Sequence, residues 1–212
     1  RGRIWALAFA LILGACEVYY GFFASFLVLA GAIIGGFAGG GWRRILDALA
    51  FGLAAAVGVL AAILPSLLYG EVATVARTPA AASDLGLKLG QLLLPVPGHR
   101  LELLAHVSKT YIRGGSAPGL GGESVASPLG LLGSIGVVLL LAHLLGARFP
   151  SSRPESSAVL ARLSLPAILF ATVGGLGSLF VTFVHPQIRA HNRMSVFIGF
   201  LSLAGLGLLL DA

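Results

Sequence analysis

Long apolar stretches constrain this chain more than any other feature. Five of them approach or reach the roughly 20 residues that a helix needs to cross a bilayer, at residues 22–40, 45–68, 129–145, 165–184 and 194–210. A sixth, at residues 4–13, is too short to cross by itself. Of the 212 residues, 57% are hydrophobic and only 10% are charged, whereas a soluble domain has about 25% charged residues. The sequence predicts an all-α fold: a polytopic transmembrane helix bundle with about five spans, forming one domain over residues 1–212.

The charge balance is basic, with 14 Lys and Arg against 8 Asp and Glu and a formal net charge of +6. In a membrane protein, basic residues mark cytoplasmic loops and contact lipid headgroups. Aromatic and basic residues do not alternate in the manner that stacks bases, so we expect membrane lipids and no nucleic acid as partners. The single cysteine, Cys16, cannot form a disulfide within these residues or a cysteine metal cluster. We predict no cofactor.

The chain begins with Arg1, and its one methionine is Met194. We therefore expect these residues to be the C-terminal part of a larger, multi-pass membrane protein.

The distribution of arginine predicts the orientation of the spans. The positive-inside rule assigns two short basic stretches to the cytoplasm, which contain Arg43 and Arg44, and Arg148, Arg153 and Arg162. Alternation of spans then places Glu17, the loop at 71–127 and the polar block at 185–193 on the outer face. An alternative stays open: if the glycines at 174–177 break the stretch 165–184 into a re-entrant hairpin, the sidedness changes.

The extracytoplasmic loop at 71–127 contains two segments with the apolar spacing of amphipathic helices, at 84–94 and 99–111. A Pro-Val-Pro-Gly turn at 95–98 separates them. Such helices lie in the membrane interface, and we expect Lys88, Arg100 and Lys109 to face the headgroups.

The polar block at 185–193 is the first candidate binding site, because cations next to apolar spans are costly to keep there. Its arginines are placed on the outer face, against the positive-inside rule. A guanidinium has a planar, forked arrangement of N–H groups that matches phosphate oxygens. The alternative reading is a set of headgroup anchors. The residues assigned to substrate binding are His185, Gln187, Arg189, His191, Asn192 and Arg193.

Two further candidates lie outside that block. His99 and Arg100 follow the rigid turn and suit an anionic headgroup, although a snorkelling pair would look the same. Glu17, at the outer end of an apolar segment, is the candidate catalytic base. The two histidines of the polar block have no third ligand at a suitable spacing, so we predict no metal site.

Several blocks resemble a group of bacterial multi-pass proteins related to the GT-C membrane glycosyltransferases, some of them labelled sugar translocase or phosphoglycerol transferase. The most specific block is Pro-Gln-Ile-Arg-Ala-His-Asn-Arg-Met-Ser-Val-Phe at 186–197. The others are residues 86–100, 127–136 and 174–180, with a weaker match at 18–23.

The resemblance implies an enzyme that transfers a sugar from a polyprenyl-phosphate donor to an acceptor on the outer face of the cytoplasmic membrane. In that superfamily the catalytic acid lies in the first outward loop, which we expect to precede Arg1. Arg189 and Arg193 are then expected to bind the carrier phosphate, because sugar transfer needs cations that stabilise charge on the departing phosphate. The alternative function is a lipid-linked sugar translocase, or a phosphoglycerol transferase-like membrane protein, without glycosyl transfer.

Overall fold

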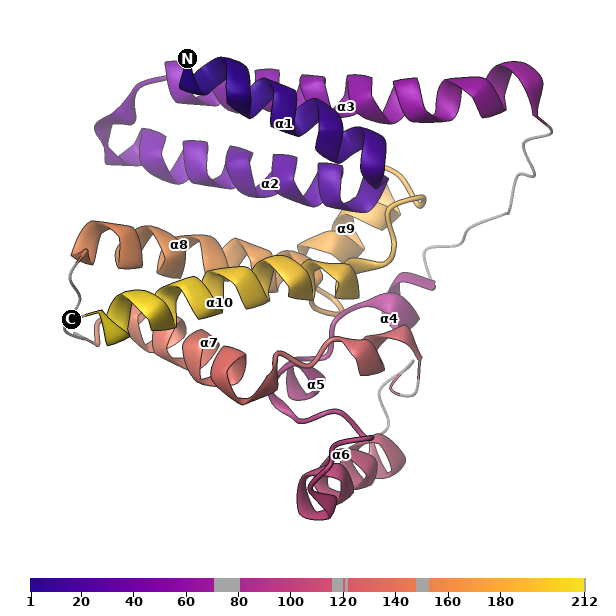
Figure 1. Ribbon diagram of the computed structural model, residues 1–212, viewed down its shortest axis with the longest axis vertical. Coiled ribbons are helices and arrows are strands. Elements are labelled where there is room, and N and C mark those ends of the chain that lie inside the picture. The colour runs from indigo at the N-terminus through magenta and orange to yellow at the C-terminus, as the bar shows by residue number, and fades with distance from the viewer. Residues whose placement is uncertain (71–80, 116–119, 121, 148–152, 212) are drawn as a thin grey trace. The chain divides into compact units, whose positions relative to one another are not determined.

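Every regular element in the described part of the chain is helical, which confirms the all-α prediction. The computed structural model describes residues 1–70, 81–115, 120, 122–147 and 153–211. The helices fall into two units, Arg1–Ala76 and Arg77–Ala212, and Figure 1 labels them in chain order.

Three helices in the described residues are long and apolar enough to cross a membrane, namely Val18–Gly35, Arg43–Tyr69 and His191–Leu210. Gly2–Cys16 and Gly130–Leu144 are apolar but shorter. At about 1.5 Å per residue, a 15-residue helix covers about 22 Å of a hydrocarbon core of about 30 Å. The three longer helices make the chain a membrane protein.

The first unit consists of α1 (Gly2–Cys16), α2 (Val18–Gly35), a π-helical turn η1 (Gly36–Gly40) and α3 (Arg43–Tyr69). One residue, Glu17, separates α1 from α2: its backbone is extended and its carboxylate accepts a hydrogen bond from the Tyr19 N–H at 3.1 Å. An acidic N-cap of this kind satisfies an N–H that the helix leaves unpaired. The expected span 22–40 thus begins earlier, at Val18, whereas the expected span 45–68 is confirmed by α3.

Glycines let α1 and α3 approach closely. A methyl group added to Gly14 would meet the Ala55 carbonyl, and one added to Gly58 would meet that of Leu11. Close backbone approach through small residues is the usual way in which helices pack inside a bilayer.

The second unit contains α7 (Gly130–Leu144), α8 (Pro154–Ala171) and α10 (Ser195–Leu210), which pack against one another. Figure 1 shows these three helices running side by side. Their shared core includes Val137, Leu140, Ala167, Ile198 and Leu201, all buried. α7 confirms an apolar helix at the expected span 129–145, although it is shorter than a full membrane crossing.

A single continuous helix over the expected span 165–184 does not form, and the chain instead breaks at the glycines named in the alternative prediction. The helix α8 begins at Pro154 and ends at Ala171, and a separate helix, α9 (Leu176–Phe183), follows after a break that contains Gly174 at φ +73°. A positive φ suits glycine because it has no Cβ. Arg162 accordingly lies within α8 and not in a loop, Arg153 is the N-cap of α8, and Arg148 lies outside the described residues.

The expected helix at 84–94 is also wrong, because two short helices replace it: α4 (Ala81–Leu85) and α5 (Leu89–Leu93). Between them Leu87 forms an isolated parallel bridge with Thr172. The Leu87 N–H donates to the Ala171 carbonyl at 2.9 Å, and the Val173 N–H donates to the Leu87 carbonyl at 3.1 Å. Two breaks in helical structure thus satisfy each other's backbone groups.

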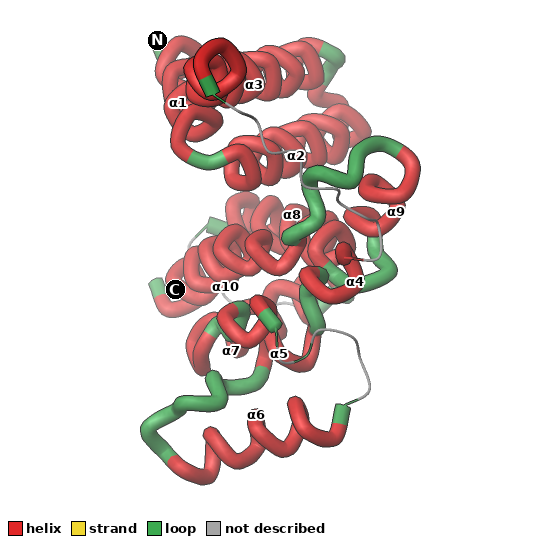
Figure 2. Tube along the Cα trace, turned by 90° about the vertical axis from the view of Figure 1, so that its right-hand side faces the viewer, coloured by secondary structure: helices red, strands yellow, loops and turns green. Residues whose placement is uncertain are grey.

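The second amphipathic helix is confirmed, shifted toward the C-terminus, as α6 (Glu102–Gly114). Figure 1 shows α6 nearly end-on, whereas Figure 2, turned by 90°, shows it lengthwise. It therefore runs across the direction of α7, α8 and α10, as an interfacial helix does beside membrane-crossing helices. Residues 71–80, 116–119 and 121 of the predicted loop lie outside the described residues.

Candidate functional site

The candidate site residues of the second unit gather at one end of its helix bundle. At this end α7 and α10 begin and α8 ends, and α4, α5, α6 and α9 also lie there (Figure 1). The Leu129 N–H, next to the start of α7, donates to the Leu92 carbonyl at 3.1 Å and joins this end to α5. The topology therefore brings the 71–127 region and the block at 185–193 to the same end of the bundle.

Within the polar block, His191 and Asn192 are buried and begin a short 3-10 helix, η3 (His191–Met194). The Nε2 atom of His191 lies 2.9 Å from the Ile188 carbonyl, and its ring meets Phe170 edge-on at 5.3 Å between centroids. A methyl group on Gly177 would clash with this ring. His191 thus holds the loop against α8 and α9, and neither His191 nor Asn192 presents its side chain to solvent.

The remaining residues of the block are accessible to different degrees. His185 and Gln187 are exposed, and His185 Nδ1 accepts a hydrogen bond from the Gln187 N–H at 3.2 Å. Arg189 and Arg193 are half-buried. Arg189 makes no hydrogen bond or ion pair with the residues that the structure describes, so its guanidinium is available to an anion.

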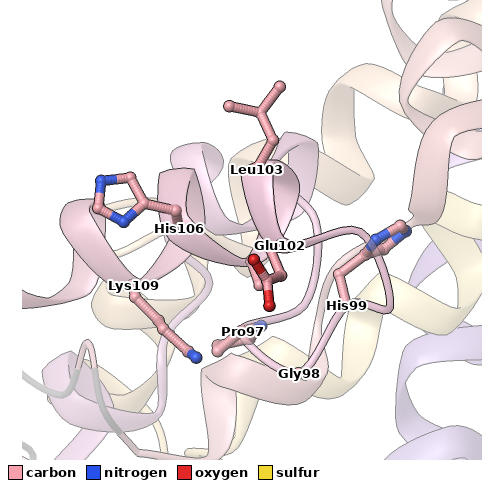
Figure 3. A pocket seen from close by; sticks show the side chains of 8 residues that line it. Pro97, Gly98, His99, Glu102, Leu103, His106 and Lys109 are labelled. Atoms are coloured by element: carbon pink, nitrogen blue, oxygen red, sulfur yellow. The ribbon is translucent and has the colours of Figure 1, made fainter.

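A polar pocket of about 670 Å³ lies between α6 and the turn that precedes it. Its lining residues are Pro97, Gly98, His99, Glu102, Leu103, Ala105, His106 and Lys109. Figure 3 shows Glu102 and Lys109 directed toward the Pro97–Gly98 turn, with His99 and His106 flanking them on opposite sides. Buried Ala105 lines it from within α6.

The turn holds His99 in place. His99 Nδ1 accepts a hydrogen bond from the Leu101 N–H at 3.1 Å, immediately before the first residue of α6. This local hydrogen bond fixes the orientation of the ring just before α6 begins. Arg100, which the sequence paired with His99, is exposed and does not line the pocket.

The sequence analysis did not single out Glu102 and His106 and treated Lys109 only as a headgroup contact. The signal was present in their spacing: positions 102, 106 and 109 follow the i, i+4, i+7 pattern of one helix face. In the pocket they combine a carboxylate, which can accept a proton, with an ammonium and two imidazoles, which can bind phosphate oxygens.

The polar block at 185–193, which contains Arg189 and Arg193 and is called the arginine loop below, lies apart from the pocket. In both Figure 1 and Figure 2, α9 lies above the level of α10 and α7, and α6 lies below it. The structure therefore does not bring Arg189 and Arg193 together with His99 and Arg100, although all four lie at one end of the unit.

Glu17 belongs to the first unit, where it is the N-cap of α2. This contact gives its carboxylate a structural function, and the catalytic assignment stays a prediction. Among the described residues, no group of three His, Cys, Asp or Glu side chains lies close enough to hold a metal ion.

Comparison with protein-family models, with curated proteins and with solved structures finds no match to this chain.

Proposed function

We propose that this chain is part of a membrane glycosyltransferase that transfers a sugar from a polyprenyl-phosphate donor to an acceptor at the membrane surface. The observation that carries the proposal is the pocket at α6. It places one carboxylate, two imidazoles and one ammonium in a single hollow, beside a helix that runs across the membrane-crossing direction (Figure 2). A polyprenyl-phosphate sugar presents its headgroup at this level while its tail stays in lipid.

The chemistry of the transfer needs two kinds of group, and the pocket has both. The acceptor oxygen forms a bond to the anomeric carbon of the sugar, and the bond from that carbon to the phosphate oxygen breaks. Glu102 takes the proton from the acceptor hydroxyl as general base. Lys109 stabilises the negative charge that remains on the polyprenyl phosphate. His99 and His106 donate hydrogen bonds to phosphate or sugar oxygens.

The arginine loop supplies a second place for carrier phosphate, as the sequence analysis expected for Arg189 and Arg193. Because α9, which precedes this loop, and α6 lie at different levels of the unit (Figure 1), the two groups predict different effects of substitution. A donor headgroup that reacts in the pocket depends on Glu102, whereas one that reacts at the loop depends on Arg189.

The test follows loss of labelled sugar from a polyprenyl-phosphate donor, using the intact protein in detergent with host membrane lipids as acceptors. Glu102→Gln should lower the transfer rate by about 10²- to 10⁴-fold, the usual contribution of a general base. Arg113→Gln is the matched control, since Arg113 lies on α6 outside the pocket lining, and should stay within about twofold of wild type, as expected for an exposed charge.

The two variants and the wild-type protein test different parts of the proposal. Loss of transfer in Arg189→Gln but not in Glu102→Gln moves the reaction to the arginine loop. Absence of any transfer by the wild-type protein rejects glycosyl transfer.

A second candidate function is translocation of a lipid-linked sugar, and the break between α8 and α9 favours it. Transporters build substrate sites from interrupted helices, and irregular backbone at membrane depth occurs where protein or a cavity covers it. Here the break at Thr172 pairs with the break at Leu87. A translocase would move a fluorescent lipid-linked sugar across a proteoliposome membrane and release no free polyprenyl phosphate in detergent.

A further inference from the structure

The first unit contains a cleft whose lining changes from charged to apolar along its length. Its volume is about 420 Å³, and its lining residues are Gly2, Arg3, Ala6, Leu7, Val28, Arg44, Asp47, Ala48 and Phe51. Three of them, Arg3, Arg44 and Asp47, are charged. Residues from all three helices contribute, so the cleft is a feature of the folded unit.

The charged part of the cleft lies at the end of the unit where α1 begins, α2 ends and α3 begins (Figure 1). Arg3 Nη2 pairs with Asp47 Oδ1 at 2.8 Å, which ties α1 to α3 across the cleft mouth. Arg44 Nη1 lies 3.5 Å from the Gly35 carbonyl, near the end of α2. Arg1 and Arg43 stand at the same end. Four arginines against one aspartate therefore leave an excess of positive charge there.

Aromatic side chains mark this end as the level of the lipid headgroups. The two tryptophans of the chain, Trp5 and Trp42, are both here, 74% and 70% exposed. Phe37, which lines a surface hollow together with Trp42, is 91% exposed. Tryptophan is enriched where a membrane-spanning helix meets the interface. From that level the cleft continues along the helices past Val28, Ala48 and Phe51. These side chains are apolar and offer no group that binds a free inorganic anion.

We propose that this cleft binds one molecule of an anionic phospholipid, phosphatidylglycerol in particular. Its phosphate lies between the guanidiniums of Arg3 and Arg44, and one acyl chain lies against Val28 and Phe51. Basic pockets between membrane helices recognise anionic headgroups in this way. Asp47 favours phosphatidylglycerol over other anionic lipids, because its carboxylate accepts hydrogen bonds from glycerol hydroxyls and repels a headgroup carboxylate. This lipid site is independent of the function proposed above.

The two tryptophans make the proposal measurable. The chain is reconstituted in phosphatidylcholine that contains increasing fractions of phosphatidylglycerol with brominated acyl chains, which quench tryptophan fluorescence on contact. Brominated phosphatidylcholine is the reference lipid. We expect phosphatidylglycerol to compete about tenfold better than phosphatidylcholine, given about 1 kcal/mol for each basic residue at a membrane surface, reduced by screening.

Two variants separate a built site from general surface charge. The double variant Arg3→Gln/Arg44→Gln should lose the preference, so that the two lipids quench equally. The control Arg1→Gln/Arg43→Gln removes the same charge from exposed positions at the same end of the unit, outside the cleft lining, and should keep the preference. Retained preference in the first double variant, or its loss in the control, overturns the proposal.

A third variant, Val28→Phe, fills the apolar part of the cleft while every arginine remains. We expect it to reduce the preference for phosphatidylglycerol at least threefold. An unchanged preference would mean that the acyl chain does not enter the cleft, which rejects the site. Inorganic phosphate at matched ionic strength should not displace the lipid, and displacement would identify a free-phosphate site instead. Equal quenching by both lipids in the wild-type protein also overturns the proposal.

Discussion

At the scale of single residues, glycine determines how closely α1 and α3 pack. Gly58 on α3 has the Leu11 carbonyl where its Cβ would be, and Gly14 on α1 faces the Ala55 carbonyl in the same way. These atoms belong to helix backbones, which cannot turn aside as a flexible side chain does. The sequence has 30 glycines, and the pattern alone does not tell which of them face a neighbouring helix. Gly207 on α10, for example, has open space around it.

Gly58→Ala should therefore lower the free energy of unfolding by about 1–3 kcal/mol, the usual cost of overpacking a well-packed contact. Gly207→Ala is the matched control and should raise it by about 0.5–1 kcal/mol, because alanine is the better helix former. Thermal unfolding in detergent measures both. Equal effects of the two substitutions would show that α1 and α3 do not approach as described.

At the scale of elements, the α4–α5 segment is held in place by a buried lysine. Lys88 is 6% exposed, and its Nζ donates to the carbonyls of Asp84 and Ser83 at 2.6 and 3.1 Å and contacts Ser124 Oγ at 3.4 Å. The ammonium thereby satisfies carbonyls near the end of α4 that the short helix leaves unpaired. The sequence analysis instead expected Lys88 at the lipid headgroups, and its burial corrects that prediction.

Burial has a consequence for the titration of Lys88. Loss of water contact lowers its pKa below the ordinary value of 10.5, and the nearby charge of Asp84 offsets this in part. Between the folded-state pKa and 10.5 the unfolded chain binds more protons, so the free energy of unfolding rises with pH over this window. The stabilising contribution of deprotonation is complete above 10.5 and is lost as pH falls through the folded-state pKa.

Comparison with Lys88→Met tests this, because methionine does not titrate. At pH 8 the variant should be about 1–3 kcal/mol less stable than wild type, from the loss of charge-assisted hydrogen bonds to Ser83 and Asp84. The difference should grow as pH rises toward 10.5 and stay constant above it, measured as paired unfolding midpoints. A difference that shrinks with rising pH would contradict the assigned burial of Lys88.

At the scale of the whole second unit, the order of the helices places the connecting segments at two opposite ends. The breaks at Leu87 and Thr172, the pocket at α6 and the polar block all belong to the end where α7 and α10 begin. The N-cap of α8, Arg153, and the last residue of α10, Leu210, belong to the other end. If this unit crosses a membrane, the candidate site and Arg153 lie on opposite sides of it. The positive-inside rule then places Arg153 on the cytoplasmic side.

Cysteine labelling measures this separation. In a Cys16→Ser background, Gln187→Cys and His106→Cys should react with a membrane-impermeant maleimide from one side of sealed vesicles. Ser156→Cys, near the start of α8, should react only from the other side. All three positions are exposed, so burial does not limit the reaction. Labelling of all three from the same side would show that the unit does not cross the membrane.

The sequence alone determined the features that depend on local chemistry. The apolar runs behind α3 and α7 and the amphipathic pattern behind α6 predicted helices at these places, because an apolar segment in lipid must satisfy its backbone within itself. The membrane setting followed from the same runs. Glu17 likewise stood out as an interruption between two apolar segments, and it separates α1 from α2.

The glycines at 174–177 allowed for a break in the stretch 165–184, but only the tertiary structure decided that the break forms, what stabilises it and which polar residues meet. The continuous apolar pattern at 165–184 gave no reason to expect that Ala171 and Val173 exchange backbone hydrogen bonds with Leu87, some 85 residues earlier. His191 looked like a ligand by its neighbours in sequence, yet Phe170 and Gly177 enclose it. The position of Glu102 beside the Pro97–Gly98 turn likewise depends on how the chain folds back before α6. Such pairings join distant parts of the chain, and local hydropathy contains no information about them.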